Sequence, residues 1–349
     1  MVVDCACGVG YAHVVRLNNT LQRMGAKRVL KACNGPEDGP LNVGCGSEHV
    51  QKGISPPKWY SDTPEAFYAA SLDGDSDRIV FFSQVKDEFA LLDGDKIAVL
   101  ICDFLQQEVA SLKKAVGDSL PPLRLGVVQT AYANGASTKY LKSVLGEENV
   151  LIAKTGVKHV HAAAHDAFDI GVYFEANGHG TVLFGDKFYS CLAHADTVAR
   201  GNIALQRLQL LPALINQAVG DALCDLLLVD AILQLQQRDI LQWNGLYQDL
   251  PSRQCKVQVE DRTMIKTNAN ETRCTSPPEL QDELDKAMEA AGPGARCFVR
   301  PSGTENVVRV YAEAATSAET DALATKAASL VHSICAGIGT PPSFTSSNL

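Results

Sequence analysis

The sequence predicts an α/β fold, with mixed or parallel sheets over most of the chain and a small α+β unit near the C-terminus. Short apolar runs typical of strands alternate with segments of helical periodicity as far as Leu250-Pro251, which is the pattern of α/β architectures. After Pro251 the predicted strands and helices are typical of a small α+β unit. The 349 residues are enough for two or three domains with hydrophobic cores.

The N-terminal region begins with a strand, a glycine turn and a helix. Gly8 and Gly10 resemble the start of a dinucleotide-binding fingerprint, but the third glycine would fall at His13, so a tight β–α turn is the favoured interpretation. The predicted elements are strands at Met1–Val3 and Arg28–Leu30, a helix from about Ala12 to Met24, and a Gly/Pro-rich loop from Asn34 to Pro57.

The middle of the chain alternates strands and helices. Asp93 is suited to cap the helix that follows it, and Pro212 and Gly220 are expected to break the last helical stretch. The two strands on either side of an Asn-Gly turn are expected to form a hairpin. The predicted strands are Ile79–Phe82, Leu125–Gln129, Val150–Ala153, Ile170–Glu175 and Val182–Phe184, and the predicted helices are about Lys96–Val109, Ser137–Leu145 and Ile203–Leu241.

The C-terminal region predicts three strands, two helices and a tail. The tail, residues 336–349, is rich in Pro, Ser, Thr and Asn and is expected to be disordered. The predicted strands are Lys256–Val259, Ala295–Val299 and Val307–Ala312, and the helices are Glu279–Ala290 and Ala318–Val331.

Composition limits the classes of function. A net charge of −9 argues against a broad nucleic-acid or anionic-membrane surface. The eleven cysteines lack metal-ligand spacing, so we expect reduced thiols and a cytoplasmic protein. Neither a signal peptide nor a membrane span is expected.

Three aspartates alternate with other residues after the apolar run Ala66–Ala70, at Asp73, Asp75 and Asp77. Carboxylates so close repel one another unless a cation lies among them, and all-oxygen ligands suit Mg²⁺ better than Zn²⁺. The apolar residues Ile79–Phe82 follow, so we predict a metal-binding loop between two buried elements. The alternative is a solvated acidic turn.

Arg78 follows the acids directly and favours a site that handles an anion beside a metal. An EF-hand is disfavoured, because Arg78 stands where its loop needs Gly and Gln84 where it needs Glu.

A second polar loop joins two predicted strands near the C-terminus. Hydroxyl groups, a glycine and two flanking arginines are the donors that a phosphate dianion needs. The candidate residues are Arg300, Ser302, Gly303, Thr304 and Arg309. A capped surface loop is the alternative, but it would not need two arginines.

Two further loops are candidates. Glu175, Asn177 and His179 follow an apolar strand and offer donors and acceptors for sugar hydroxyls, although the segment also resembles a plain Asn-Gly hairpin turn. Lys158 and His159 lie in another predicted loop and are acid/base candidates, although a histidine there is more often structural.

These loops resemble those of a known family, the α-D-phosphohexomutases, over about Val3 to Ala314. The signature loops are Asp73-Gly74-Asp75-Ser76-Asp77-Arg78, Glu175-Ala176-Asn177-Gly178-His179-Gly180 and Arg300-Pro301-Ser302-Gly303-Thr304-Glu305. Two further segments resemble those of the branch of this family that acts on N-acetylglucosamine phosphates. They are Gln129-Thr130-Ala131-Tyr132-Ala133-Asn134-Gly135 and Thr155-Gly156-Val157-Lys158-His159.

The resemblance implies two α/β phosphohexomutase domains followed by a small α+β domain. The implied limits are 1–90 with the metal loop, 91–250 with the sugar loop and 251–335 with the phosphate loop. The family has a further, first domain that carries a phosphoserine in a Ser-His-Asn-Pro loop, and this chain contains no such motif. Cys5 and Cys7 depart from the family, which usually has Gly and Asn there.

The resemblance also implies an activity, the interconversion of N-acetylglucosamine 6-phosphate and 1-phosphate for UDP-N-acetylglucosamine synthesis. A phosphoserine would phosphorylate the sugar, and a sugar 1,6-bisphosphate would serve as primer and intermediate. Asp73, Asp75 and Asp77 would hold Mg²⁺ and Arg78 would contact the transferred phosphoryl group. Glu175, Asn177 and His179 would contact the sugar, and Arg300, Ser302, Gly303, Thr304 and Arg309 the other phosphate. Lys158 and His159 would be acid/base residues.

Three hypotheses remain open at this stage. The first is a mutase that is inactive without the phosphoserine domain, and the second is a non-catalytic protein that binds phosphosugars. The third is a phosphatase of the haloacid dehalogenase type, because Asp73-Gly74-Asp75 after an apolar run resembles its nucleophile motif. The expected partner is a small phosphosugar, with neither nucleic acid nor membrane, and self-association through a surface left by the absent domain is possible.

Overall fold

The computed structural model describes residues 1–27, 29–57, 68–85 and 88–344. The chain divides into two compact units, each built from several segments. The first unit comprises Met1–Val128, Tyr140–Leu151 and Val160–Tyr247, and the second comprises Gln129–Lys139, Ile152–His159 and Gln248–Leu349.

The N-terminal part of the first unit is a mixed five-stranded sheet. Its strand order is β2-β1-β3-β4-β5, with β1 parallel to β2 and β3 and the other pairs antiparallel. The strands are β1 Val2–Asp4, β2 Lys31–Cys33, β3 Ala69–Leu72, β4 Ile79–Val85 and β5 Glu88–Leu92, and the helices are α1 Gly10–Arg23 and α2 Ser47–Gly53. Val2, Val50, Ala69, Val80 and Phe82 form a small core.

The first strand, the glycine turn and the first helix are found where the sequence predicts them. The next elements differ from the predicted ones. The second strand lies at Lys31–Cys33. Of the predicted strand Arg28–Leu30, Val29 and Leu30 are not in a strand and Arg28 lies outside the described residues. The predicted loop contains α2, which starts after Gly46 and buries Val50; one buried apolar residue in a seven-residue helix gives too weak a periodicity to detect. Ala66 and Phe67 of the apolar run lie outside the described residues.

Most of the second sheet also belongs to the first unit. Its order is β7-β6-β8-β9, with β6 parallel to β8, and β8 and β9 form the predicted antiparallel hairpin. The strands are β6 Leu125–Thr130, β7 Val150–Ala153, β8 Ile170–Phe174 and β9 Gly180–Phe184. The helices are α3 Gly94–Val116, α4 Gly135–Leu145, α5 Val157–Ala167, α6 Asp186–Val198, α7 Ile203–Leu214, α8 Ala222–Leu235 and α9 Ile240–Asn244.

Helix α3 begins as predicted, because the Asp93 carboxylate accepts hydrogen bonds from the backbone N–H groups of Asp95 and Lys96. The predicted helical stretch from Ile203 to Leu241 is three helices. Pro212 lies in the last turn of α7, and new caps at Asp221 and Asp239 start α8 and α9. Helices α5 and α6 were not predicted as helices.

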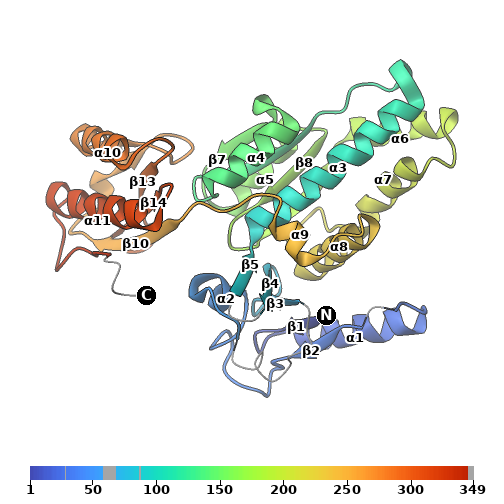
Figure 1. Cartoon of the computed structure of the whole chain (residues 1–349), viewed down its shortest axis with the longest axis horizontal. Helices are drawn as coiled ribbons and strands as arrows, with labels where there is room; N and C mark the ends of the chain where they lie inside the picture. Colours follow the sequence, from blue (N-terminus) through green and yellow to red (C-terminus); the bar gives the residue numbers. More distant parts are fainter. Residues whose placement is uncertain (28, 58–67, 86–87, 345–349) are drawn as a thin grey trace. The chain divides into compact units, whose positions relative to one another are not determined.

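The second unit contains a three-stranded antiparallel sheet covered on one face by two helices (Figure 1). The strands are β10 Ser252–Gln258, β14 Val307–Glu313 and β13 Arg296–Pro301, in that order across the sheet, and the helices are α10 Pro278–Ala291 and α11 Ser317–Ile334. A small hairpin, β11 Lys266–Thr267 and β12 Cys274–Ser276, lies beside them. The predicted α+β character is confirmed.

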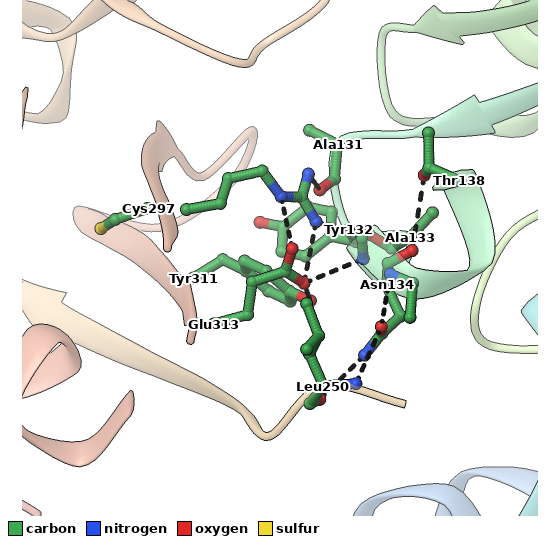
Figure 2. A network of polar contacts seen from close by, with 12 residues as sticks. Ala131, Tyr132, Ala133, Asn134, Thr138, Leu250, Cys297, Tyr311 and Glu313 are labelled. Atoms are coloured by element: carbon green, nitrogen blue, oxygen red, sulfur yellow. Dashed lines mark hydrogen bonds and ion pairs between the residues drawn. The ribbon is translucent and has the colours of Figure 1, made fainter. Parts of the chain in front are cut away.

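A buried ion pair fixes the loop before α4 to the other face of this sheet (Figure 2). Arg296 Nε lies 2.9 Å from Glu313 Oε1, and its Nη1 donates to the carbonyl of Ala131. The same carboxylate accepts hydrogen bonds from the backbone N–H of Gly135 and from the hydroxyl of Tyr311. Since Gly135 starts α4, Glu313 places a negative charge at a helix N-terminus, where it is stabilising.

The predicted disorder of the tail, residues 336–349, is wrong for residues 336–344. Ile338 N–H donates to Gln258, Gly337 bridges to Val259, and Phe344 N–H donates to Thr325 on α11. Backbone pairing therefore orders a segment whose composition predicts disorder, while residues 345–349 lie outside the described residues. In the part of the chain that the structure describes, no helix is long and apolar enough to span a membrane.

Candidate functional site

The three aspartates lie on the loop between β3 and β4, as predicted. Carboxylate oxygens of Asp73, Asp75 and Asp77 all lie within 4.8 Å of one another. The loop is held by Asp73, whose Oδ1 accepts hydrogen bonds from the backbone N–H groups of Asp77 and Arg78, each at 3.1 Å. The loop is therefore organised by its own backbone, leaving other carboxylate oxygens able to converge on a cation.

The electrostatics of this loop favour a bound cation. Burial raises the pKa of Asp73 to about 7, and the neighbouring Asp77 and Asp75 add to that shift. Three carboxylates at this separation are most stable when a divalent ion neutralises them. The donor set is all oxygen and partly buried, so these residues fit Mg²⁺.

Arg78 lies beside the aspartates but forms no short ion pair with them. Its Nε is 3.6 Å from Asp73 Oδ2 and 3.7 Å from Asp77 Oδ1, which is too long for strong hydrogen bonds. This Nε is buried and has no hydrogen-bond partner among the described residues. The guanidinium is therefore suited to bind an anion next to the metal loop.

The Gly8-Val9-Gly10 turn supports the metal loop. A Cβ on Gly8 would lie 2.2 Å from the Gly74 carbonyl oxygen, and a Cβ on Gly10 would lie 2.5 Å from Ser76 Oγ. Val9 N–H donates to the same Gly74 carbonyl at 3.1 Å. Close backbone approach, rather than a dinucleotide, therefore explains these two glycines.

The turn that carries Glu175, Asn177 and His179 packs directly on the metal loop. The carbonyl of Gly178 accepts a hydrogen bond from Ile79 N–H at 3.1 Å, immediately after Arg78. Gly178 has φ +88°, and a Cβ there would lie 1.9 Å from the Ile79 carbonyl oxygen. Two motifs that are far apart in the sequence thus form one surface in the first unit.

His179 has a contact that the sequence did not predict. Its Nδ1 lies 3.1 Å from Asp77 Oδ2, so it contacts a candidate metal ligand, and its backbone N–H donates to Asn177 Oδ1. A Cβ on Gly220 would lie 2.8 Å from the His179 ring. The ring is therefore held between the metal loop and the segment before α8, with its Nδ1 occupied.

The two arginines of the predicted phosphate loop face each other in the second unit. Arg300 on β13 pairs with Arg309 on β14, and Arg309 in turn pairs with Lys256 on β10. Like charges directly opposite on a sheet are destabilising, so this row is suited to an anion. Arg309 Nε is buried without a hydrogen-bond partner among the described residues.

The loop between these strands combines a buried serine with an uncovered glycine. Ser302 is buried, and its Oγ lies 3.4 Å from the backbone nitrogens of Thr304 and Glu305, which donate to it. A Cβ on Gly303 would meet no atom within 4 Å. The loop backbone therefore remains accessible to a ligand beside the arginines.

Lys158 and His159 differ from the prediction in their location. They lie in the first turn of α5, not in a loop, and Gly156 before them has φ +116°. The mixture of short apolar and histidine residues over Val157–Ala167 gives a weak helical signal, which explains the error. Basic groups at a helix N-terminus are electrostatically unfavourable, so an anion nearby would stabilise them.

Sequence reasoning missed Glu271, which is buried beside the phosphate loop. Its Oε2 lies 2.9 Å from Arg300 Nε and accepts a hydrogen bond from Thr155 N–H at 3.0 Å. Nothing in its local sequence marks it, because both partners are distant along the chain. The candidate residues fall into two sets, the metal and sugar loops in the first unit and the phosphate loop, Glu271, Lys158 and His159 in the second.

Two family models match the chain. Residues 93–238 match the model described as phosphoacetylglucosamine mutase AMG1, domain III. Residues 256–330 match the model of the phosphoglucomutase/phosphomannomutase C-terminal domain.

Among curated relatives, the phosphoacetylglucosamine mutase of Arabidopsis thaliana is 46% identical over 344 residues, which is 95% of this chain and 60% of that protein. The human phosphoacetylglucosamine mutase is 42% identical, covering 97% of this chain and 61% of that protein. The chain thus spans about three fifths of the length of these relatives.

Solved structures agree in fold. The N-acetylphosphoglucosamine mutase of Aspergillus fumigatus, in complex with GlcNAc-6P and magnesium, superposes with a TM-score of 0.85 at 40% identity, over 96% of this chain and 61% of that one. An N-acetylglucosamine-phosphate mutase of the α-D-phosphohexomutase superfamily, in its product complex, gives a TM-score of 0.84 at 40% identity, over 95% of this chain and 61% of that one.

Proposed function

Because the chain belongs to the phosphoacetylglucosamine mutase family of the α-D-phosphohexomutases, we propose that it serves in the Mg²⁺-dependent interconversion of N-acetylglucosamine 6-phosphate and 1-phosphate. The observation that carries the proposal is the packing of the Glu175–Gly180 turn on the acidic loop, through the Ile79–Gly178 hydrogen bond and the His179–Asp77 contact. A metal loop joined to a turn rich in sugar-binding groups suits a phosphosugar better than a simple phosphate ester.

In this proposal Asp73, Asp75 and Asp77 hold Mg²⁺. When bound, the ion neutralises charge on the phosphoryl group during transfer. Arg78, whose Nε has no hydrogen-bond partner among the described residues, binds an oxygen of the same group. Removing the Arg78 charge would then weaken binding of the phosphoryl group more than binding of the metal.

The sugar and the second phosphate are assigned to separate residues. Glu175 and Asn177 bind sugar hydroxyl groups, and His179 orients Asp77 through its Nδ1. Arg300, Arg309 and the Ser302–Thr304 loop bind the phosphate that is not transferred, because fork-shaped guanidinium groups match phosphate oxygens. Lys158 and His159 remain acid/base candidates.

The phosphoryl carrier is assigned to none of these residues. The 349 residues contain no Ser-His-Asn-Pro segment, and phosphoryl transfer needs a nucleophile held in line beside the metal. The proposal therefore gives these residues the binding of metal, sugar and phosphate. The sugar 1,6-bisphosphate is the intermediate that they would bind during reorientation.

The test follows ³¹P NMR signals of N-acetylglucosamine 6-phosphate with the 349-residue chain, Mg²⁺ and a sugar 1,6-bisphosphate. We expect saturable broadening of the 6-phosphate signal without appearance of the 1-phosphate. Release of inorganic phosphate would instead support a phosphatase, and formation of the 1-phosphate would mean that a residue of this chain accepts the phosphoryl group. Absence of any broadening at millimolar ligand would refute the proposal.

A further inference from the structure

Glu271 has an unusual backbone conformation in a tightly held turn. It has φ +59°, a left-handed conformation that Glu rarely adopts. The turn follows β11 and is closed by Asn268, whose carbonyl accepts from Glu271 N–H and whose Oδ1 accepts from Thr272 N–H. A strained residue held so firmly by its surroundings is a reason to look for a function.

The left-handed turn places the side-chain carboxylate of Glu271 between two segments of the candidate site. The residue is 5% exposed. Its Oε2 lies 2.9 Å from Arg300 Nε and 3.0 Å from Thr155 N, which donates a hydrogen bond to it. Thr155 begins the segment that continues to Lys158 and His159, so one carboxylate joins that segment to the phosphate loop.

Arg300 needs such a partner more than most arginines do. It lies opposite Arg309, and Lys256 continues the same positive row. Repulsion along the row favours rotation of the Arg300 side chain away from Arg309. A buried carboxylate whose Oε2 lies 2.9 Å from Nε opposes that rotation.

A second group supports the same orientation. Tyr132 packs its ring against Phe298 and Tyr311, and burial raises the pKa of its hydroxyl while the neighbouring Arg300 opposes that shift. The guanidinium therefore lies between a carboxylate and a fixed aromatic residue. Both contacts limit its freedom before any ligand arrives.

We propose that Glu271 is a positioning residue that holds Arg300 ready to bind the sugar phosphate and fixes the Thr155–His159 segment beside it. This inference rests on the proposed function, because it names Arg300 as a phosphate ligand. Preorganisation of this kind improves affinity by reducing the cost of ordering the side chain on binding.

The alternative role of Glu271 is that of a counter-ion which competes with phosphate for Arg300. The two roles predict opposite signs for Glu271→Gln. If Glu271 only neutralises Arg300, then removing its charge should tighten phosphate binding. If it positions Arg300, the same change should weaken binding by about tenfold, the size found when an outer partner of a liganding group is lost.

The experiment measures affinity by calorimetry for the 349-residue chain and three variants, with N-acetylglucosamine 6-phosphate and with inorganic phosphate. Glu271→Gln removes the charge. Glu271→Gly removes the whole side chain together with the backbone strain, so its thermal midpoint reports the lost ion pair and the relieved left-handed backbone together. Glu283→Gln, on the exposed face of α10 in a pair with Lys286, is the matched control for the loss of one negative charge.

We expect both Glu271 variants to bind the sugar phosphate about tenfold more weakly, with binding by Glu283→Gln unchanged. All three variants should keep a cooperative thermal transition, which shows that they fold. Unchanged or tighter binding in Glu271→Gln would overturn the inference. If the parent binds inorganic phosphate but not the sugar phosphate, then the proposed function fails and the phosphate titration still decides the role of Glu271. Binding of neither ligand would overturn both.

Discussion

Replacing Gly178 by Ala tests whether the Glu175–Gly180 turn and the acidic loop Asp73–Arg78 depend on each other for their conformation. An alanine at φ +88° is in the left-handed region, which costs an L-residue about 1–2 kcal/mol. Its Cβ would also lie 1.9 Å from the Ile79 carbonyl oxygen, so the turn must move away from β4. The hydrogen bond from Ile79 N–H to Gly178 would then be lost, at about 0.5–1.5 kcal/mol. The expected total is about 1.5–3.5 kcal/mol.

The chain offers a matched control for this change. Gly201 has φ +87°, but a Cβ there would meet no atom within 4 Å. Gly201→Ala should therefore show only the backbone cost of about 1–2 kcal/mol. The difference between the two variants isolates the contact between the turn and the metal loop.

The assay is urea denaturation followed by tryptophan fluorescence, since Trp243 is fully buried in the first unit. Calorimetric titration with Mg²⁺ is the second readout, because movement of the turn releases Asp77 from His179. Gly178→Ala should weaken Mg²⁺ binding and Gly201→Ala should not. Equal loss of stability in both variants, with equal Mg²⁺ affinity, would refute the reasoning.

Three further substitutions have defined outcomes. Asp75→Ala should abolish the heat of Mg²⁺ binding, because it removes one of three candidate ligand carboxylates. The control Asp118→Ala, at an exposed aspartate, should leave that heat unchanged. An unaffected titration in Asp75→Ala would contradict the metal assignment. Arg309→Ala should weaken binding of N-acetylglucosamine 6-phosphate by about 1.5–3 kcal/mol, the range for a charge-assisted hydrogen bond, and affinity within twofold of the parent would count against the phosphate loop. Glu313→Ala should destabilise the second unit by about 3–5 kcal/mol, because it leaves Arg296 without its buried partner; a loss below 1 kcal/mol in thermal or urea unfolding would show that the pair is not needed.

Elements with strong local signals could be predicted from the sequence. Asp93 before α3 and the Asn-Gly turn between β8 and β9 act within a few residues of their effect, so the sequence contains the information. Helix α6 has a glycine at its N-cap without a side-chain hydrogen bond, and no residue marks its start. Its stability comes from burying Phe188, Cys191 and Leu192 against other elements, which local pattern does not show.

The candidate site also contains features that local sequence predicts and contacts that it does not predict. The clustering of the three aspartates on one loop could be predicted, because they lie within five positions of one another. The pairing of His179 with Asp77 and of Glu271 with Arg300 could not, because it depends on how strands from distant segments align. Glu271 adopts a left-handed conformation only because the turn around Asn268 imposes it, and that geometry has no sequence signature.

Calorimetric titration of the 349-residue chain with N-acetylglucosamine 6-phosphate in the presence of Mg²⁺ tests the central claim most directly. The proposed function predicts saturable binding that is weakened in both Asp75→Ala and Arg309→Ala, one from each set of residues. Binding should be unchanged in Arg200→Ala, an exposed position just after α6. Binding that ignores both Asp75→Ala and Arg309→Ala, or no binding at millimolar sugar phosphate, would contradict it.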